Sequence, residues 1–321
     1  MTSAHQAIAQ LQAYIEKQII GQSELVNRLM IAILADGHLL VEGAPGLAKT
    51  RAIHMLSQGL EGDYQRIQFT PDLLPADLTG TEIFRPKEGT FHFQSGPLFH
   101  NIILADEINR APAKVQSALL EAMAERQVTV ASVSYPLPEM FLVMATQNPL
   151  EQEGTYPLPE AQLDRFLLKV KIDYPDAVAE RAILALSRRE AAQKEPVEEA
   201  VELKQEHIFA ARQEVLNVYM SDALEEYLIQ IIMSTRNPAL YGDDLKAWLE
   251  YGASPRATIA LDRCARAHAW LDGRDYVTPL DIQSLAYDVL RHRIILSYEA
   301  EAEGVDPDTW IGELITRIAI P

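Results

Sequence analysis

A glycine-rich octamer in the first sixth of the chain combines the residue types that bind a phosphate chain. It follows the apolar run 38–42 and precedes a segment whose apolar residues recur at helical spacing. Backbone N–H groups of such a loop and of the following helix point at one place, where Lys49 adds a positive charge and Thr50 offers a hydroxyl to Mg²⁺. This chemistry suits a nucleoside triphosphate. The candidate phosphate-binding residues are Gly43, Ala44, Pro45, Gly46, Leu47, Ala48, Lys49 and Thr50.

One position in this loop departs from the usual pattern. Ala48 stands where a second glycine normally precedes the lysine. An alanine is compatible with a residue that is already turning into a right-handed helix, and it is unfavourable only where φ is positive. We therefore expect Ala48 to adopt a right-handed conformation at the start of the helix.

Two adjacent acids follow a second apolar run. Residues 102–105 read Ile-Ile-Leu-Ala and end in Asp106 and Glu107, which predicts a strand buried on both faces with two carboxylates at its C-terminal edge. Ligands of open α/β sheets bind at that edge. We assign Asp106 to Mg²⁺, directly or through water, and Glu107 to the water that attacks the γ-phosphate.

A third apolar strand, 141–146, runs into Gln147, Asn148 and Pro149. A polar side chain at this point would lie between the phosphate loop and the acidic pair. Asn148 is therefore expected to orient the attacking water. Two arginines are further candidates: Arg165, and Arg256, which opens a helix after Ser254 as N-cap.

These residues require a sheet that brings the ends of several strands together. We predict a five-stranded parallel sheet with helices on both faces, which places the chain in the α/β class. Beyond about residue 174 the pattern is helical to the end. The expected domains are a nucleotide-binding core at 1–174 and an all-α domain at 175–321. The predicted strands lie at 38–42, 66–70, 101–105, 141–146 and 167–172.

Two segments inserted between these strands alternate apolar and polar residues around turn signals. The first, within 71–98, predicts a β-hairpin placed within a helix, and the second spans 127–135. The first carries Phe91 and Phe93, which either pack onto their own domain or contact a substrate. Sequence leaves both readings open.

In several segments the chain resembles the AAA+ ATPases, and within them the MoxR family. The matching segments are Ile19 to Gln22, Gly43 to Thr50, 105–112, 145–149 and 158–166, so the resemblance covers the chain from about residue 10. It implies the sheet order 5-1-4-3-2 and identifies the hairpins as a helix-2 insert and a pre-sensor-1 hairpin, which face the pore or the substrate in related rings.

The resemblance also implies roles for single residues. Lys49 and Thr50 would belong to Walker A and Asp106 and Glu107 to Walker B. Asn148 would be sensor 1, Arg165 an arginine finger acting on a neighbouring subunit, and Arg256 sensor 2, with Arg110 a second candidate for an inter-subunit contact. The residues expected to border the adenine are Ile19, Ile20, Gly21 and Gln22.

Composition suits a folded protein of two domains. The chain has 321 residues, 48% of them hydrophobic and 23% charged. The single cysteine, Cys264, excludes an internal disulfide and is expected in the core. The N-terminus lacks the features of a signal peptide, and no apolar run reaches the roughly 18 residues of a membrane span. We therefore expect a cytoplasmic protein.

Charge limits the class of partner. With 46 acidic and 28 basic residues, the net charge of −18 repels a phosphate backbone and disfavours a nucleic-acid partner. We interpret clustered bases such as 291–293 as solvated faces. The resemblance implies an ATP- and Mg²⁺-dependent ring, a hexamer, that remodels a protein client and works with a von Willebrand factor A domain protein. The alternatives are a nucleic-acid motor or loader and a magnesium-chelatase-like subunit.

Overall fold

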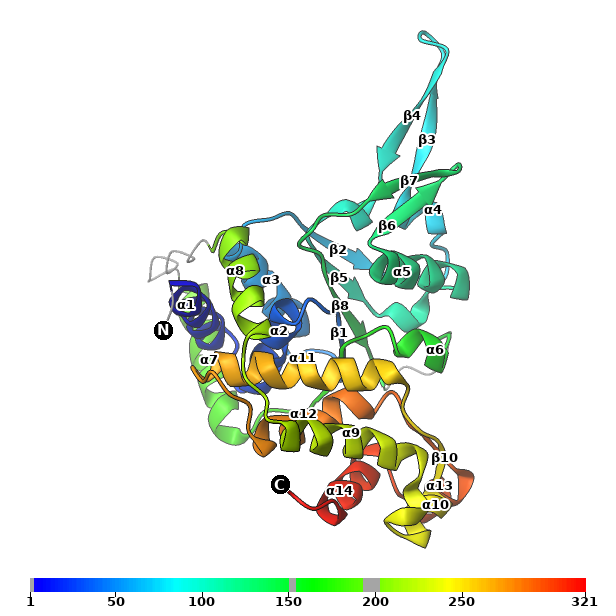
Figure 1. The fold of residues 1–321 in the computed structure, drawn as a ribbon. Helices are drawn as coiled ribbons and strands as arrows, with labels where there is room; N and C mark the ends of the chain where they lie inside the picture. The colour runs from blue at the N-terminus through cyan, green and yellow to red at the C-terminus, as the bar shows by residue number, and fades with distance from the viewer. Residues whose placement is uncertain (1–2, 150–153, 193–202) are drawn as a thin grey trace.

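A five-stranded parallel sheet forms the centre of the molecule (Figure 1), a computed structural model that describes residues 3–149, 154–192 and 203–321. The strand order is β2-β5-β8-β1-β9. This confirms the predicted sheet and the strand order that the family resemblance implies, although the second strand begins two residues earlier than predicted. The strands are β1 (Leu39–Gly43), β2 (Tyr64–Gln68), β5 (Ile102–Asp106), β8 (Leu142–Gln147) and β9 (Leu168–Ile172).

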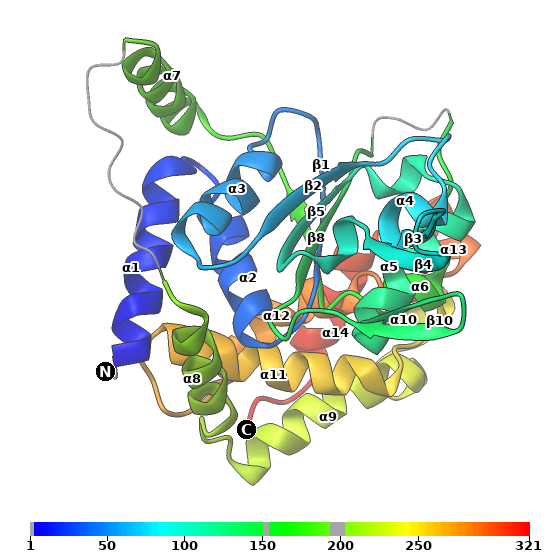
Figure 2. The same cartoon turned by 90° about the horizontal axis from the view of Figure 1, so that it is seen from above.

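Each central strand sends alternate side chains into two apolar layers. Leu39 and Val41 belong to one core cluster and Leu40 to the other, as expected from the twofold period of a strand. Because both faces are covered, the inner strands β1, β5 and β8 are mostly apolar along their length, whereas the edge strand β9 alternates. Figure 2 shows α1 (Ser3–Gln18), α2 (Ser23–Leu34) and α3 (Lys49–Gly59) on one face of the sheet, and α4 (Pro75–Thr79) and α5 (Ala113–Glu125) on the other.

Both predicted hairpins are present and project from one side of the sheet (Figure 1). The first, β3 (Gly80–Arg85) and β4 (Thr90–Ser95), lies between α4 and the 3₁₀ turn η1 (Pro97–Phe99), and the second pairs β6 (Gln127–Val130) with β7 (Val133–Pro136). The ring of Phe93 stacks on Tyr135 of the second hairpin with 3.9 Å between ring centroids. Phe91, by contrast, is 67% exposed. Packing therefore accounts for Phe93 and leaves Phe91 available.

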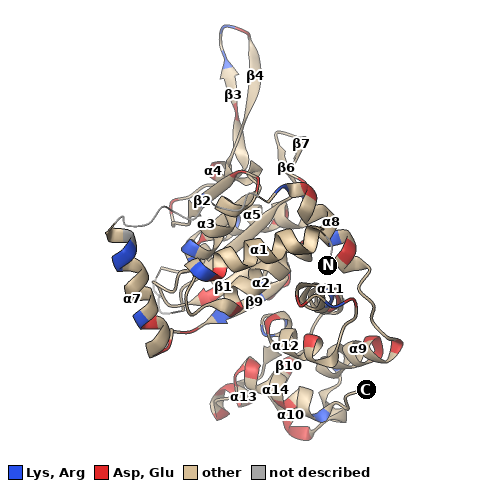
Figure 3. Ribbon diagram, turned by 90° about the vertical axis from the view of Figure 1, so that its left-hand side faces the viewer, with Lys and Arg blue, Asp and Glu red and all other residues tan. Residues whose placement is uncertain are grey.

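The second half of the described chain is almost wholly helical. One apolar cluster runs from α1 and α2 through α11 and α12, so the helical part shares a core with one face of the sheet, and Cys264 is buried within it as predicted. Figure 3 shows acidic residues on α10 and α13. The elements are η2 (Ile108–Arg110), α6 (Glu160–Leu163), α7 (Ala177–Ala191), α8 (Gln205–Leu216), α9 (Asp222–Arg236), η3 (Pro238–Leu240), α10 (Asp243–Trp248), β10 (Leu249–Tyr251), α11 (Pro255–Leu271), α12 (Pro279–Leu290), β11 (Ile295–Leu296), α13 (Tyr298–Glu303) and α14 (Pro307–Arg317).

The basic residues at 291–293 do not form a solvated face, and that interpretation was wrong. The Arg293 side chain is 2% exposed; its Nε donates to Asp164 at 2.8 Å and its Nη2 to the carbonyl of Phe166 at 2.6 Å. Arg291 donates to Asp308 at 2.8 Å. The end of α12 packs against the chain entering β9, whose buried carbonyls need donors and whose carboxylates need paired charges. The cluster therefore joins the helical part to the sheet.

Candidate nucleotide-binding site

The loop between β1 and α3 leaves space beside its backbone for a ligand. Gly46 has φ of 86° and no atom within 4 Å of the place where a Cβ would stand, so its backbone faces open space. Ala48 has φ of 57° and ψ of 13°, which is the left-handed region. The expectation of a right-handed Ala48 was therefore wrong, because α3 begins one residue later and Ala48 makes the turn into it. An alanine there costs about 1–2 kcal/mol, a strain typical of ligand-binding loops.

Lys49 lies close enough to the carboxylates of Asp106 and Glu107 to interact with their charges. Its Nζ donates to the carbonyl of Gly43 at 2.5 Å. Burial lowers the pKa of Lys49, while the charges of Asp106, Glu107 and Glu42 act to raise it. The cation and the acidic pair therefore share one electrostatic environment, as the order of strands β1, β8 and β5 requires.

Asp106 is buried at the end of β5 and is held by two side chains. Its Oδ1 accepts a hydrogen bond from Thr146 Oγ1 at 2.7 Å, and its Oδ2 accepts one from Arg66 Nη2 at 2.6 Å. The cation of Arg66 thus balances a carboxylate whose side chain is only 12% exposed. The carboxylate oxygens of Asp106 and the hydroxyl of Thr50 are hard donors of the kind that Mg²⁺ prefers, so these residues fit that ion.

Glu107 has an unusual backbone and a well-defined carboxylate. Its φ is 57°, and its N–H donates to Thr146 Oγ1 at 2.9 Å. Glu107 Oε2 accepts hydrogen bonds from Gln68 Nε2 at 2.8 Å and from Arg110 Nη1 at 2.9 Å. Arg110, considered as an inter-subunit contact, therefore has a partner in its own chain.

Sequence reasoning missed three side chains of this site: Arg66, Gln68 and Thr146. Arg66 and Gln68 stand two residues apart on β2, which pairs with β5. Their spacing puts both on one face of a strand, and the sheet order implied by the family resemblance places that strand beside the acidic pair, which is the signal that could have found them. Thr146 precedes the predicted sensor by two residues, and its hydroxyl joins Asp106 to Glu107.

Asn148 follows β8, the strand between β5 and β1. It is 6% exposed. The fold thus brings Asn148 to the edge that carries the phosphate loop and the acidic pair, as its position after the third apolar run predicts.

A pocket of about 410 Å³ lies beside the loop, within the size range of small-molecule sites. Ile20 and Gln22 line it, and Gln22 Nε2 donates to the carbonyl of Asp173 at 3.0 Å. Gly21 turns there with φ of 78°. Ile19, however, is 2% exposed and belongs to the apolar core. The remaining lining residues come from the end of α1, the phosphate loop, α3, the segment leading into α7 and α7 itself: Gln18, Pro45, Gly46, Leu47, Ala48, Arg51, Tyr174, Pro175, Glu180, Ile183, Leu186 and Ser187.

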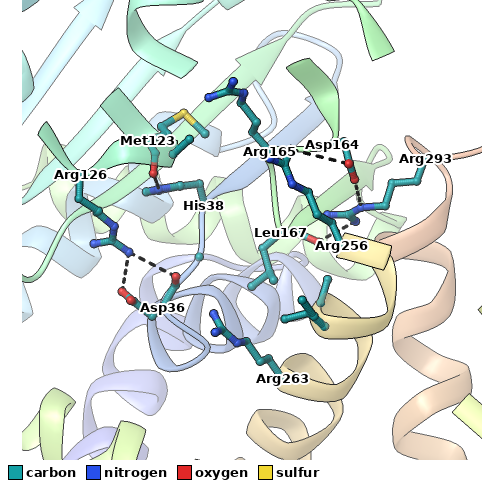
Figure 4. A pocket seen from close by; sticks show the side chains of 14 residues that line it. Asp36, His38, Met123, Arg126, Asp164, Arg165, Leu167, Arg256, Arg263 and Arg293 are labelled. Atoms are coloured by element: carbon teal, nitrogen blue, oxygen red, sulfur yellow. Dashed lines mark hydrogen bonds and ion pairs between the residues drawn. The ribbon is translucent and has the colours of Figure 1, made fainter. Parts of the chain in front are cut away.

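Arg165 and Arg256 do not join this pocket. Both line a second hollow of about 390 Å³, shown in Figure 4. This hollow includes His38 and Leu167, which precede β1 and β9, whereas the phosphate loop follows β1. Because a strand rises about 3.3 Å per residue, the five residues of β1 separate the two ends by about 16 Å.

The two arginines are held near each other by neighbours in the second hollow. Arg165 Nη1 donates to the carbonyl of Leu120 at 2.8 Å. Arg256 Nη1 lies 3.8 Å from Asp164 Oδ2, with its side chain 56% exposed. Asp164 also accepts a hydrogen bond from Ser254 Oγ at 2.8 Å, and Ser254 caps α11. Asp164, which precedes Arg165 in the chain, is thus linked to α11, the helix that carries Arg256.

Comparisons with known proteins agree with this architecture. The family described as "ATPase family associated with various cellular activities (AAA)" matches residues 38–168, and the "AAA lid domain" matches residues 246–314. The chain is 44% identical to Chaperone MoxR1 of Mycobacterium tuberculosis over 96% of this chain and 80% of that protein. It is 32% identical to Protein MoxR of Methylorubrum extorquens over 96% of this chain and 94% of that protein.

A crystal structure of a Cytophaga hutchinsonii protein assigned as an ATPase superposes with a TM-score of 0.89 at 46% identity, covering 99% of this chain and 96% of that one. Within the described residues, none of the helices has the length and apolar character that crossing a membrane requires.

Proposed function

The chain belongs to the MoxR family of AAA+ ATPases, and from this premise we propose that it hydrolyses ATP with Mg²⁺ in a hexameric ring and thereby remodels a protein client. The observation that carries the proposal is that the candidate site residues lie in two separate places. Lys49 and the acidic pair converge at one end of the strands, while Arg165 and Arg256 lie together at the other. One subunit thus offers a nucleotide-binding edge and, separately, a surface of arginines.

In this proposal the loop Gly43 to Thr50 and Lys49 bind the β- and γ-phosphates, and Ile20 and Gln22 border the base. Asp106 and Thr50 would hold Mg²⁺, which supplies charge neutralisation to the phosphates. Arg66 donates to Oδ2 of Asp106, and the carboxylate keeps further lone pairs for the ion.

Glu107 is the proposed base. A carboxylate in this position accepts a proton from the attacking water while Asn148 orients that water. Gln68 and Arg110 occupy its Oε2, so Glu107 becomes available when those hydrogen bonds are exchanged.

Arg165 and Arg256 are proposed to act on the nucleotide of the next subunit. A guanidinium supplied from a neighbour stabilises the charge that develops on a transferring phosphoryl group. The separation of about 16 Å along β1 argues against their action within their own chain. The functional unit is therefore a pair of adjacent copies, and closure of such pairs gives a ring.

A protein client is favoured by the exposed tip of the first hairpin. Phe84 is 50% exposed and Phe91 67% exposed, and their rings pair at 5.2 Å between centroids. An exposed aromatic pair next to the hairpin turn suits an unfolded or loosely packed protein segment. The net charge of −18 disfavours a nucleic-acid motor or loader. A partner with a von Willebrand factor A domain and a cytoplasmic location complete the proposal, and a magnesium-chelatase-like role remains its alternative.

The active-site assignment is tested by two variants with opposite expectations. Lys49→Ala should lose ATP affinity in calorimetry, because it removes the charge aimed at the phosphates. Glu107→Gln should keep ATP and Mg²⁺ binding but lose turnover. Wild-type affinity in the first variant or wild-type turnover in the second would contradict the assignment.

The division of the site is tested by mixing. Arg165→Ala should bind ATP yet hydrolyse it on the order of 10³-fold more slowly. Mixed with Lys49→Ala, it should regain activity, since an intact nucleotide site then meets an intact arginine surface. No regain in mixed assemblies confirmed by mass would refute action between subunits. Stimulation of the ATPase by DNA that weakens with salt would instead support the nucleic-acid motor.

A further inference from the structure

A third arginine faces the same hollow as Arg165 and Arg256. On α11, Arg256, Ile259 and Arg263 stand at i, i+3 and i+7, so they share one face of the helix. All three are exposed and line the hollow, and Ile259 is 55% exposed. In Figure 4, Arg263 and Arg165 lie on opposite walls of the hollow. No described residue makes a hydrogen bond or ion pair with Arg263.

The charges around this hollow are unbalanced. Its described lining contains five arginines and two aspartates. Asp36 is occupied by Arg126 at 2.7 Å and by Arg212 at 2.8 Å. Asp164 is occupied by Arg293 at 2.8 Å and approached by Arg256 at 3.8 Å.

Arg263 is therefore left without a carboxylate, in a protein whose net charge is −18. Cations gathered against the overall charge make a site for a multiply charged anion, and guanidinium groups match phosphate geometry. The hollow thus offers a phosphate-bearing ligand more cationic groups than Arg165 and Arg256 alone provide.

We propose that Arg263 binds the nucleotide held by a neighbouring copy of this chain, at the α- and β-phosphates rather than at the γ-phosphate. The inference rests on the proposed function, in which Arg165 and Arg256 approach the γ-phosphate. Seven residues of helix place Arg263 about 10 Å along α11 from Arg256. With Arg256 assigned to the γ-phosphate, a guanidinium this far along the helix needs another anionic group, and the α- and β-phosphates are the anionic groups that remain on the nucleotide.

This position gives Arg263 a different kinetic signature from that of Arg165. ATP and ADP share the α- and β-phosphates, so Arg263 contributes equally to the binding of both nucleotides. It contributes little to the chemical step, because charge develops at the γ-phosphate. An interaction that is equal in ground state and transition state changes KM and leaves kcat unaltered.

The test is steady-state kinetics of the assembled full chain with Arg263→Ala. The KM for ATP and the inhibition constant for ADP should both rise about tenfold, the effect of losing one charge-assisted hydrogen bond, with kcat within about twofold of wild type. Arg263→Lys should give an intermediate KM, because lysine keeps the positive charge but lacks the planar guanidinium that can donate two parallel hydrogen bonds. The matched control is Lys204→Ala, a 66% exposed cation at the start of α8, which should match wild type.

Mixing two variants tests whether Arg263 acts on the nucleotide of its own subunit or on that of the neighbouring subunit. Lys49→Ala carries an intact Arg263, so adding it to Arg263→Ala should lower the KM of the remaining intact sites toward the wild-type value. A KM equal to that of the Lys204 control, or a loss of kcat at unchanged KM, would overturn the assignment of Arg263. If Arg165→Ala nevertheless regains activity on mixing, the proposed function stands without it. Failure of the Arg165 mixture would refute the shared site itself.

Discussion

Replacing Thr146 with valine should disconnect the two acids of the site. Thr146 is 1% exposed. Its hydroxyl donates to Asp106 Oδ1 at 2.7 Å and accepts from the N–H of Glu107 at 2.9 Å. Valine keeps the shape of the side chain and removes both hydrogen bonds, so the change tests polarity without creating a cavity.

The expected size of the effect follows from these two contacts. A hydrogen bond to a charged group contributes about 1.5–3 kcal/mol and a neutral one about 0.5–1.5 kcal/mol. We expect Thr146→Val to lower the free energy of unfolding by about 2–4 kcal/mol. Glu107 should also lose its position, because its left-handed backbone at φ 57° is held by this hydroxyl. A displaced catalytic group can lower kcat by about 10²-fold.

Urea unfolding and ATP turnover measure the two effects, and Thr146→Ser is the matched control. Serine keeps the hydroxyl and loses only a methyl group, so its turnover should remain near that of wild type. If Thr146→Val and Thr146→Ser unfold at the same urea concentration and turn over ATP equally, the hydroxyl does not organise the site. The reasoning that joins Asp106 to Glu107 through Thr146 would then be refuted.

Three further predictions concern pH, buried charge and the hairpins. Burial lowers the pKa of His38 to about 4, below its value in the unfolded chain. The contribution of His38 to the free energy of unfolding should therefore fall by about 2 kcal/mol from pH 7 to pH 5. Urea titrations at both pH values would measure this change. Asp164→Ala should cost about 3–5 kcal/mol in the same assay, because it leaves Arg293 buried and unpaired. Phe93→Ala should lower the thermal midpoint through its lost stacking, whereas Phe91→Ala should spare the midpoint and impair client remodelling.

Each of these has a discriminating outcome. His38→Gln removes one of two buried histidines with lowered pKa, so it should reduce the fall in stability between pH 7 and pH 5 while His292 retains part of it; an unchanged slope would assign that dependence elsewhere. Asp164→Ala combined with Arg293→Met should recover part of the lost stability, and no recovery would contradict the buried-pair explanation. Equal thermal midpoints for the Phe91 and Phe93 variants would show that the stack carries no stability.

The sequence by itself determined the features that reside in contiguous segments. A buried parallel strand is a short apolar run, so the positions of β1, β5 and β8 followed from the local pattern, and the edge strand β9 followed from its alternation of apolar residues with lysine. The phosphate loop and the acidic pair stand at the ends of such runs, and parallel strands bring those ends to one edge. Both hairpins could also be predicted, because the alternation of apolar and polar residues and the turn residues are local signals.

The tertiary structure decided what depends on neighbours far apart in sequence. Only the pairing of β2 with β5 brings Arg66 and Gln68 to the acids, and only the packing of α12 against the start of β9 buries Arg293. The positive φ of Ala48 depends on where α3 begins after the turn. Motif order could not show that Arg165 lies at the opposite end of the strands from Lys49, because a motif specifies residue types along a chain, whereas distance is set by how the elements pack.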